Sequence, residues 1–292
     1  MKLNRTVVVL GAVVFLGSVL ATAQTTASCT YTTFQYPGAI GTTASGINDY
    51  NTVVGYTSVN GTLIGFIRWA NGTFTKVNVP GSGRTQLFGR NNNGVSVGSY
   101  LDANGAHAFI FTSSGYQTID YPGAFTTDLF GINNYNSSVG DARTTNAQLG
   151  LKRWSNGGFT KIQYPNSTAT QINGINDSGV MVGMNGADAG PNTMIAFALI
   201  NGKFQQITDP NAGSLSTWVS GINNNQVIVG TGYIGNPPRS SHGFFVVNGQ
   251  VKEMPTPSGA SDLQANGINK NGLIVGTGTF GGTPKGFIAK CQ

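Results

Sequence analysis

Charged side chains are scarce in this chain of 292 residues. Only 9% of the residues are Asp, Glu, Lys or Arg, whereas about 25% is usual for a soluble domain. The basic residues form no stripe of the kind that follows a phosphate backbone, so we predict no nucleic-acid partner. Glu253 is the one glutamate, which leaves aspartates as the main groups for acid–base chemistry.

Histidine and cysteine are equally rare, with two of each. Two imidazoles in distant segments make a poor ligand set for zinc. The sequence also contains no His-Glu-x-x-His zinc motif and no Asp-x-Asp-x-Asp calcium loop. We therefore predict that the protein uses no metal ion and no cofactor.

Long hydrophobic runs are missing beyond the N-terminal segment. The one such run, residues 6–20, follows two basic residues and precedes Ala21-Thr22-Ala23. This arrangement is typical of a secretory signal peptide, and the run is shorter than the roughly 20 residues of a membrane span. We predict a signal peptide at residues 1–23, with a membrane anchor as the alternative. Residues 24–292 are expected to form a single secreted or periplasmic domain with no membrane span.

Glycine and asparagine are abundant, and they recur in a repeat. A Gly-Ile-Asn step, replaced once by Gly89-Arg90-Asn91, is followed each time by a Val-Gly pair. The pairs recur about every 42 to 47 residues, a period typical of propeller blades. The glycines of the six pairs are Gly55, Gly98, Gly140, Gly183, Gly230 and Gly276.

Each repeat has room for four short strands. In the second repeat, apolar and β-branched runs predict strands at residues 85–91, 95–101, 106–112 and 116–121, which we name A, B, C and D. Asn92-Asn93-Gly94 separates A from B. Asparagine and glycine accept the positive φ of tight turns, so A/B and C/D are predicted to be hairpins.

The two ends of the chain complete one repeat. Residues 29–37 match strand D, and the last repeat stops after strand C. We therefore predict an all-β fold, a six-bladed β-propeller of four-stranded blades. The last blade is expected to be closed by the N-terminal strand, because closure removes both exposed sheet edges.

The two cysteines test this closure. Aligned on the repeat, Cys29 and Cys291 flank the same C/D turn, on the two strands expected to meet at the seam. Such positions are within reach of a disulfide, and an exported chain meets the oxidising conditions that preserve one. We predict a Cys29–Cys291 disulfide; two free thiols are the alternative.

The repeat resembles a known family. Gly-Ile-Asn and Val-Gly steps are followed by His107-Ala108-Phe109 in the second repeat and by His242-Gly243-Phe244 in the fifth. This pattern is similar to the bacterial extracellular repeat family named HAF after that tripeptide. The resemblance spans the whole mature chain, and it implies export without implying a particular activity.

One face of the ring is predicted to carry function. The A/B turns hardly change between repeats, whereas the B-to-C loops differ in length and content, and function usually resides on such loops held by a rigid scaffold. The candidate ligand contacts on that face are Tyr100, Asp102, His107, Asp128, Asp141, Arg143, Asp188, Trp218, Tyr233, Arg239 and His242.

Several of these residues also have a structural interpretation. His107 and His242 open strand C, where a hydrogen-bonded packing position is the alternative to catalysis. Trp218 lies on an inner strand and either stacks on a sugar or packs between blades. Trp69 and Trp154 lie on the opposite face, and we interpret them as structural. The asparagine that ends each inner strand is expected to bond its own turn.

The fold alone does not select one function. We first predict a secreted, monomeric, non-catalytic propeller that binds an extracellular ligand, either a glycan or a surface protein. The alternative is a carbohydrate-active hydrolase or lyase, in which aspartates of the candidate set form a carboxylate pair near the axis with one of the histidines. A structural role in an envelope or matrix is the third hypothesis.

Overall fold

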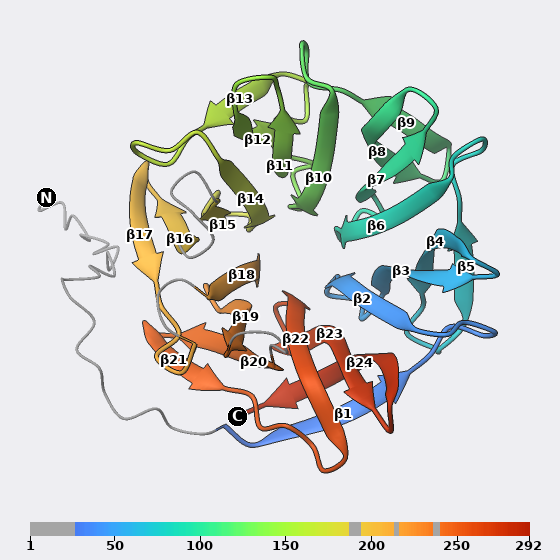
Figure 1. Cartoon of the computed structure of the whole chain (residues 1–292), viewed down its shortest axis with the longest axis vertical. Helices are drawn as coiled ribbons and strands as arrows, with labels where there is room; N and C mark the ends of the chain where they lie inside the picture. Colours follow the sequence, from blue (N-terminus) through green and yellow to red (C-terminus); the bar gives the residue numbers. More distant parts are fainter. Residues whose placement is uncertain (1–26, 187–193, 213–215, 236–239) are drawn as a thin grey trace, which may run out of the picture.

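The computed structural model describes residues 27–186, 194–212, 216–235 and 240–292, and all of the regular structure in these segments is β-strand (Figure 1). The predicted signal peptide lies outside the described residues. Across the described segments, no helix has the length and apolarity that crossing a membrane requires.

The strands pair antiparallel in six groups of four, which we call blades 1 to 6. Blade 1 contains β2 (Thr42–Ile47), β3 (Val53–Val59), β4 (Thr62–Arg68) and β5 (Phe74–Val77). Blade 2 contains β6 (Arg84–Arg90), β7 (Ser96–Asp102), β8 (Gly105–Thr112) and β9 (Gly115–Ile119). Blade 3 contains β10 (Thr126–Ile132), β11 (Ser138–Arg143), β12 (Gln148–Arg153) and β13 (Phe159–Ile162).

The second half of the chain repeats this arrangement. Blade 4 contains β14 (Thr170–Ile175), β15 (Met181–Asn185), β16 (Ile195–Ile200) and β17 (Lys203–Ile207). Blade 5 contains β18 (Thr217–Ile222), β19 (Ile228–Ile234), β20 (Ser240–Val247) and β21 (Gln250–Glu253). Blade 6 contains β22 (Ala260–Ile268), β23 (Leu273–Phe280), β24 (Thr283–Cys291) and β1 (Cys29–Phe34). Figure 1 shows the blades around one axis, with β2, β6, β10, β14, β18 and β22 innermost.

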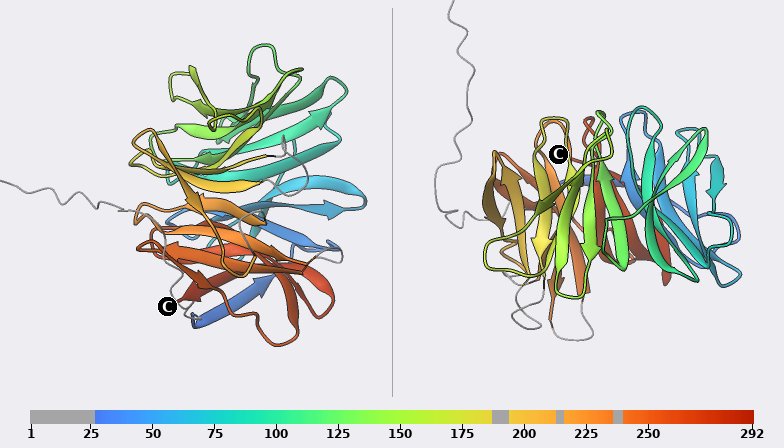
Figure 2. Two further views of the ribbon diagram at one scale, coloured as in Figure 1. Left: turned by 60° about the vertical axis from the view of Figure 1, so that its left-hand side comes forward. Right: turned by 90° about the horizontal axis from the view of Figure 1, so that it is seen from above.

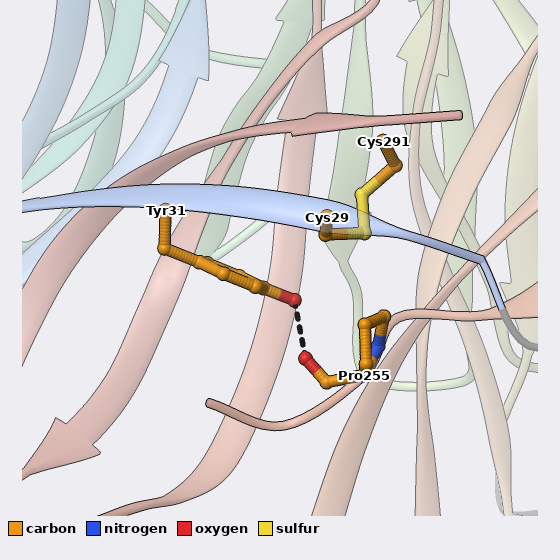
Figure 3. Close-up of a disulfide and its surroundings, with 4 residues drawn as sticks. All are labelled: Cys29, Tyr31, Pro255 and Cys291. Atoms are coloured by element: carbon orange, nitrogen blue, oxygen red, sulfur yellow. Dashed lines mark hydrogen bonds between the residues drawn. A yellow bond between two sulfur atoms is a disulfide. The ribbon is translucent and has the colours of Figure 1, made fainter. Parts of the chain in front are cut away.

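The strand at the N-terminus completes blade 6. β1 pairs with β24 from Cys29 opposite Cys291 to Phe34 opposite Gly286, and the two cysteines form the predicted disulfide (Figure 3). In the same strand, the Tyr31 hydroxyl donates a hydrogen bond of 2.8 Å to the Pro255 carbonyl. Burial raises the pKa of Tyr31 to about 12, so this hydroxyl remains a donor at physiological pH.

The glycine of each Gly-Ile-Asn step, or of its variant, lies where neighbouring inner strands approach most closely. A Cβ built on Gly174 would lie 3.2 Å from the Cα of Gly221, and one on Gly267 would lie 3.1 Å from the Cα of Gly46. A side chain at these positions would force adjacent strands apart. In every blade, a Cβ on this glycine would meet the Cα of the matching glycine in the next blade. These contacts form a closed cycle through Gly46, Gly89, Gly131, Gly174, Gly221 and Gly267.

The asparagines that end the inner strands form a second cycle. Asn48 Oδ1 accepts hydrogen bonds from the backbone amides of Tyr50 (3.1 Å) and Thr52 (3.0 Å), which confirms the predicted bonding to its own turn. Its Nδ2 also donates to the Asn91 carbonyl of the next blade at 3.2 Å. The equivalent donors, each reaching the following blade, are Asn91, Asn133, Asn176, Asn223 and Asn269.

Candidate functional site

The disc has two faces, which we name by the connections they carry. The turn face carries the A/B and C/D turns, such as residues 48–52 and 69–73, and the loop face carries the B-to-C and D-to-A connections, such as residues 143–148. Seen edge-on (Figure 2, right), the strands run between the two faces, and the C-terminus lies at the upper one. Because β24 ends at a C/D position, that upper face is the turn face.

Two candidate carboxylates lie opposite each other near the loop face. Asp128 of inner strand β10 is the register partner of Asp141 on β11, so both side chains project from the same side of the sheet. Asp141 is only 1% exposed. Its Oδ2 accepts a hydrogen bond from Gln148 Nε2, while its Oδ1 is buried with no partner among the described residues.

This environment makes Asp141 an unusual acid. Burial raises the pKa of its carboxyl to about 7, and the negative charge of Asp128 adds to the increase, against the opposing effects of Gln148 and Arg143. A carboxyl in this range exchanges a proton near neutral pH, a property common among catalytic groups. The sequence placed Asp128 and Asp141 in the candidate set but gave no sign of the burial.

Both histidines pair with aspartates in separate blades. His242 Nε2 lies 2.6 Å from Asp209 Oδ2, and the two side chains are 6% and 0% exposed. Burial opposes a charge on His242, but the hydrogen bond to Asp209 and the charge of that group, assisted by Glu253, raise the pKa of His242 above its ordinary value. His107 lies between Asp120 (3.0 Å) and Asp102 (3.4 Å). These contacts agree with the structural interpretation.

Two aromatic candidates meet in blade 5. The Trp218 and Tyr233 rings form an edge-to-face pair with centroids 5.7 Å apart, and both side chains are partly exposed. Trp218 Nε1 is buried with no hydrogen-bond partner among the described residues. The pair therefore combines packing within the blade with limited access from solvent.

The other candidates are spread over the loop face or lie beneath it. Tyr100 is 7% exposed and stacks on His107, with ring centroids 5.2 Å apart, whereas Arg143 is exposed at the end of β11. Asp188 and Arg239 lie outside the described residues. The structure thus unites the described candidates only in local groups. These are Asp128 with Asp141 and Arg143, Trp218 with Tyr233, and Tyr100 with Asp102 and His107.

Further motifs do not add a catalytic centre. Residues 94–98 match the Gly-x-Ser-x-Gly pattern of serine hydrolases, but Ser96 is fully buried and lies at the start of β7. Its Oγ accepts a hydrogen bond from Arg90 Nη1 at 2.8 Å, whereas the hydrolase pattern needs an exposed serine on a sharp turn. Nowhere in the described segments do three His, Cys, Asp or Glu side chains gather as metal ligands.

The turn face holds a groove between blades 1 and 2. It encloses about 540 Å³, and we call it the Trp69 groove. Tyr50 and Trp69 are its aromatic walls, 68% and 39% exposed respectively. The residues that line it are Asn48, Tyr50, Thr52, Trp69, Ala70, Asn71, Arg90, Asn92, Asn93 and Gly94.

Local contacts fix the aromatic and cationic parts of this groove. Trp69 Nε1 donates a hydrogen bond of 2.9 Å to Thr75 Oγ1, and the Arg90 guanidinium lies 5.5 Å from the centroid of the Trp69 ring. Arg90 Nη1 also donates to the Gly94 carbonyl at 2.9 Å. A ring and a cation held in this way are suited to binding, because little side-chain freedom is lost when a ligand docks.

The sequence interpretation treated Trp69 as structural. Its hydrogen bond to Thr75 and its contact with Arg90 agree with that interpretation, while its exposed ring also lines the groove. The turns themselves looked uniform, which drew attention to the loops. A signal for the groove in the sequence is the pairing of a large aromatic at the end of strand C with another in the A/B turn of the same repeat, since exposed aromatics that form one contiguous patch often mark a binding surface.

Comparisons with known proteins identify the architecture. No protein-family model matches the chain, and no curated protein matches its sequence. Solved structures do match. A luciferin-regenerating enzyme aligns with a TM-score of 0.56 at 9% identity, covering 90% of this chain and 95% of that chain. TolB from Acinetobacter baumannii aligns at 0.54 and 10%, covering 84% and 66%.

A streptogramin B lyase also aligns, with a TM-score of 0.51 at 11% identity, covering 90% of this chain and 98% of that chain. The chain has the β-propeller fold. At such low identity the likeness extends to the fold alone, and the resemblance to HAF repeats stays a prediction.

Proposed function

We propose that this propeller is an exported protein that binds glycan chains in the Trp69 groove. The observation that carries the proposal is the groove itself, in which two exposed aromatic rings stand beside asparagine amides. A sugar ring has an apolar C–H face, which packs on an indole or phenol ring, and a hydroxyl edge, which bonds amides. Concave sites of this mixed character are typical ligand sites.

The disulfide supports the exported location. Disulfides persist in extracellular and periplasmic compartments and are rare in a reducing cytosol. The Cys29–Cys291 bond joins β1 to β24 at the seam of the ring. There it stabilises the closed ring against unfolding outside the cell.

The turn face is a better site for this function than the loop face, where the candidates predicted from the sequence lie. Tyr100, Asp141 and His242 of the loop-face set are all less than 9% exposed, so a ligand reaches them only after side chains move. Tyr50 and Trp69 need no such movement. The Trp69 groove is open as it stands.

The three tryptophans of the chain provide a direct test. Each indole N–H gives one resonance in a nitrogen–proton spectrum, and Trp→Phe variants assign the three signals. We expect at least one of cellohexaose, xylohexaose and hexagalacturonate to shift the Trp69 signal in a saturable way. A shift of the Trp218 signal alone would place the binding site on the loop face. If none of the three oligosaccharides shifts the Trp69 signal, the proposal is rejected.

A variant pair then measures what the ring contributes. Trp69→Ala is expected to weaken binding at the groove about 30-fold, followed through the Asn93 side-chain amide, because loss of a central aromatic costs about 2 kcal/mol. Phe125→Ala is the control, since Phe125 is 59% exposed and lies outside the groove. Equal affinity in the two variants would contradict the assigned role of Trp69.

A second candidate function is glycan cleavage at the loop face. The observation that favours it is the register pair of Asp128 and Asp141. The Asp141 carboxyl is buried and has a pKa raised to about 7, whereas Asp128 is only partly buried. Acid and base roles in glycosidic chemistry require carboxyl groups whose environments differ in this way. Asp141 is then the proton donor, and Asp128 is the base or nucleophile.

Product analysis separates this candidate from pure binding. If it holds, the wild type releases new reducing ends from the polysaccharide that shifts an indole signal, and Asp128→Asn lowers the rate at least 100-fold while the fold persists. Asp262→Asn, at a carboxylate on β22 of blade 6, three blades away from Asp128 and Asp141, should retain the full rate. Absence of product from every bound polysaccharide would eliminate the enzymatic candidate.

A further inference from the structure

Blade 3 repeats the aromatic elements of the Trp69 groove. We infer that the turn face carries a second, equivalent glycan site built on Tyr135 and Trp154, and that the protein is therefore bivalent for polysaccharide. The inference rests on the proposed function, because it assigns the same ligand chemistry to a second place on the same face.

The strand register makes Trp69 and Trp154 equivalent. The glycine of each Val-Gly pair faces one strand C residue, Phe66 in blade 1 and Leu151 in blade 3. Each tryptophan follows that residue by three positions. The positions that match them in the other blades hold no tryptophan; they are Thr112, Ile200, Val247 and Lys290.

The two indoles are fixed by the same contacts. Trp154 Nε1 donates a hydrogen bond of 2.9 Å to Thr160 Oγ1, matching in length and type the bond from Trp69 to Thr75. Asn156 Oδ1 accepts a hydrogen bond from the Gly158 amide at 3.0 Å, as Asn71 Oδ1 does from the Thr73 amide at 3.0 Å. The C/D turns of blades 1 and 3 thus hold their tryptophan rings through the same hydrogen bonds.

The exposed surfaces are also alike. Trp154 is 44% exposed, against 39% for Trp69, and Tyr135 is 68% exposed, as is Tyr50. Each tyrosine amide donates to the asparagine two residues earlier at 3.1 Å. In the other blades the tyrosine position holds Asn93, Ser178, Asn225 and Asn271. The tyrosine and tryptophan occur together in blades 1 and 3, as a shared function requires.

A cation accompanies each indole, although it comes from a different place. Arg90 reaches the Trp69 ring from blade 2, with 5.5 Å to the centroid, whereas Lys152 of blade 3 lies 3.6 Å from the Trp154 centroid. Among the described residues neither cation is in an ion pair with a carboxylate. Each cation places a hydrogen-bond donor beside an exposed ring, where it can meet the hydroxyl or carboxylate oxygens of a sugar.

The placement of the two sites has a functional consequence. Blades 1 and 3 are two steps apart in the ring (Figure 1). Both aromatic pairs lie in A/B and C/D turns, which share the turn face. A polysaccharide repeats its epitope many times, so two sites on one rigid body bind it with avidity that a single site lacks, or connect two chains. The protein then acts as a cross-linker of a glycan matrix.

The indole titration with the same three hexasaccharides tests the second site without altering it. We expect the Trp154 signal to shift together with the Trp69 signal, with dissociation constants within a few-fold and a calorimetric stoichiometry of two. A shift of Trp69 alone, with a stoichiometry of one, would overturn the second site and leave the proposed function intact. Failure of both signals to move with all three probes would overturn the proposed function itself.

Matched variants test bivalency on the parent polymer of the hexasaccharide that binds. Trp154→Ala and Trp69→Ala should each retain one site for the hexasaccharide yet lose about 100-fold in apparent affinity for the immobilised polymer. Tyr116→Ala, at an exposed aromatic of blade 2 outside both sites, should lose none. Equal loss of hexasaccharide and polymer binding in a single variant would contradict bivalency.

Discussion

Reduction of the Cys29–Cys291 disulfide is expected to lower the free energy of unfolding by about 5 kcal/mol. The bond closes a loop with a sequence separation of 262 residues, and a cross-link of that length removes much of the conformational entropy of the unfolded chain. Within the sheet β1 pairs with β24 alone, so the cross-link lies at the seam where the ring closes. Urea unfolding of the mature chain, oxidised and reduced, measures the difference.

A second contact of the same strand provides the control. Tyr31→Phe removes one hydrogen bond, from the Tyr31 hydroxyl to Pro255, and leaves the disulfide in place, so it should cost about 1 kcal/mol. The double variant Cys29→Ser/Cys291→Ser should behave as the reduced protein does. A reduced protein that unfolds at the same urea concentration as Tyr31→Phe would show that the seam does not depend on the cross-link.

The repeat allowed most of the fold to be predicted. Each strand of the second repeat lies within one period, and its hairpin turns are marked by Asn92-Asn93-Gly94 and Ser113-Ser114-Gly115. The predicted strands of this repeat therefore agree with β6 to β9 within two residues. The disulfide also followed from the sequence. Its prediction needed only the chain order of strands in blade 6, because that order places Cys29 opposite Cys291.

Properties that depend on the neighbouring blade were not predictable from one repeat. The asparagine Nδ2 groups reach carbonyls about one period away in sequence, and this second role becomes visible only when the ring is assembled. The same holds for Asp141. Its hydrogen-bond donor Gln148, on strand C, also contacts Gln171 of blade 4 at 3.3 Å.

The groove on the turn face was not among the sites predicted from the sequence, and the loop-face candidates stay a prediction. Variation in loop length indicated one face, while the open groove with aromatic walls lies on the other. The sequence contains the local cause. Arg90 replaces the isoleucine of the other repeats, and it brings a guanidinium beside Trp69 at the boundary of blades 1 and 2.

Replacement of Asp141 by asparagine is expected to stabilise the protein at pH 8 and to leave its stability at pH 4 almost unchanged. The pKa of Asp141 is about 7 in the folded state, against 3.8 as its ordinary value. Between these values the folded state binds a proton that the unfolded chain releases. Stability of the wild type therefore falls as the pH rises from about 4 to 7 and stays low above it.

The size of this effect follows from the shift. A difference of about three units corresponds to about 4 kcal/mol that the ionised carboxylate costs the folded protein at pH 8. Asp141→Asn keeps the shape and the bond from Gln148 but has no charge to bury, so it avoids most of that cost. Urea midpoints of wild type and variant, measured from pH 4 to pH 9, should separate progressively above pH 5.

Two further variants show whether the effect belongs to this carboxyl. Asp128→Asn removes the neighbouring charge that helps to raise the pKa of Asp141. The free energy of unfolding of this variant should still fall as the pH rises, but the fall should end at a lower pH. Asp262→Asn should leave the transition where it is. A parallel pH dependence in wild type and Asp141→Asn would mean that another group titrates, and it would remove the proton donor on which the enzymatic candidate depends.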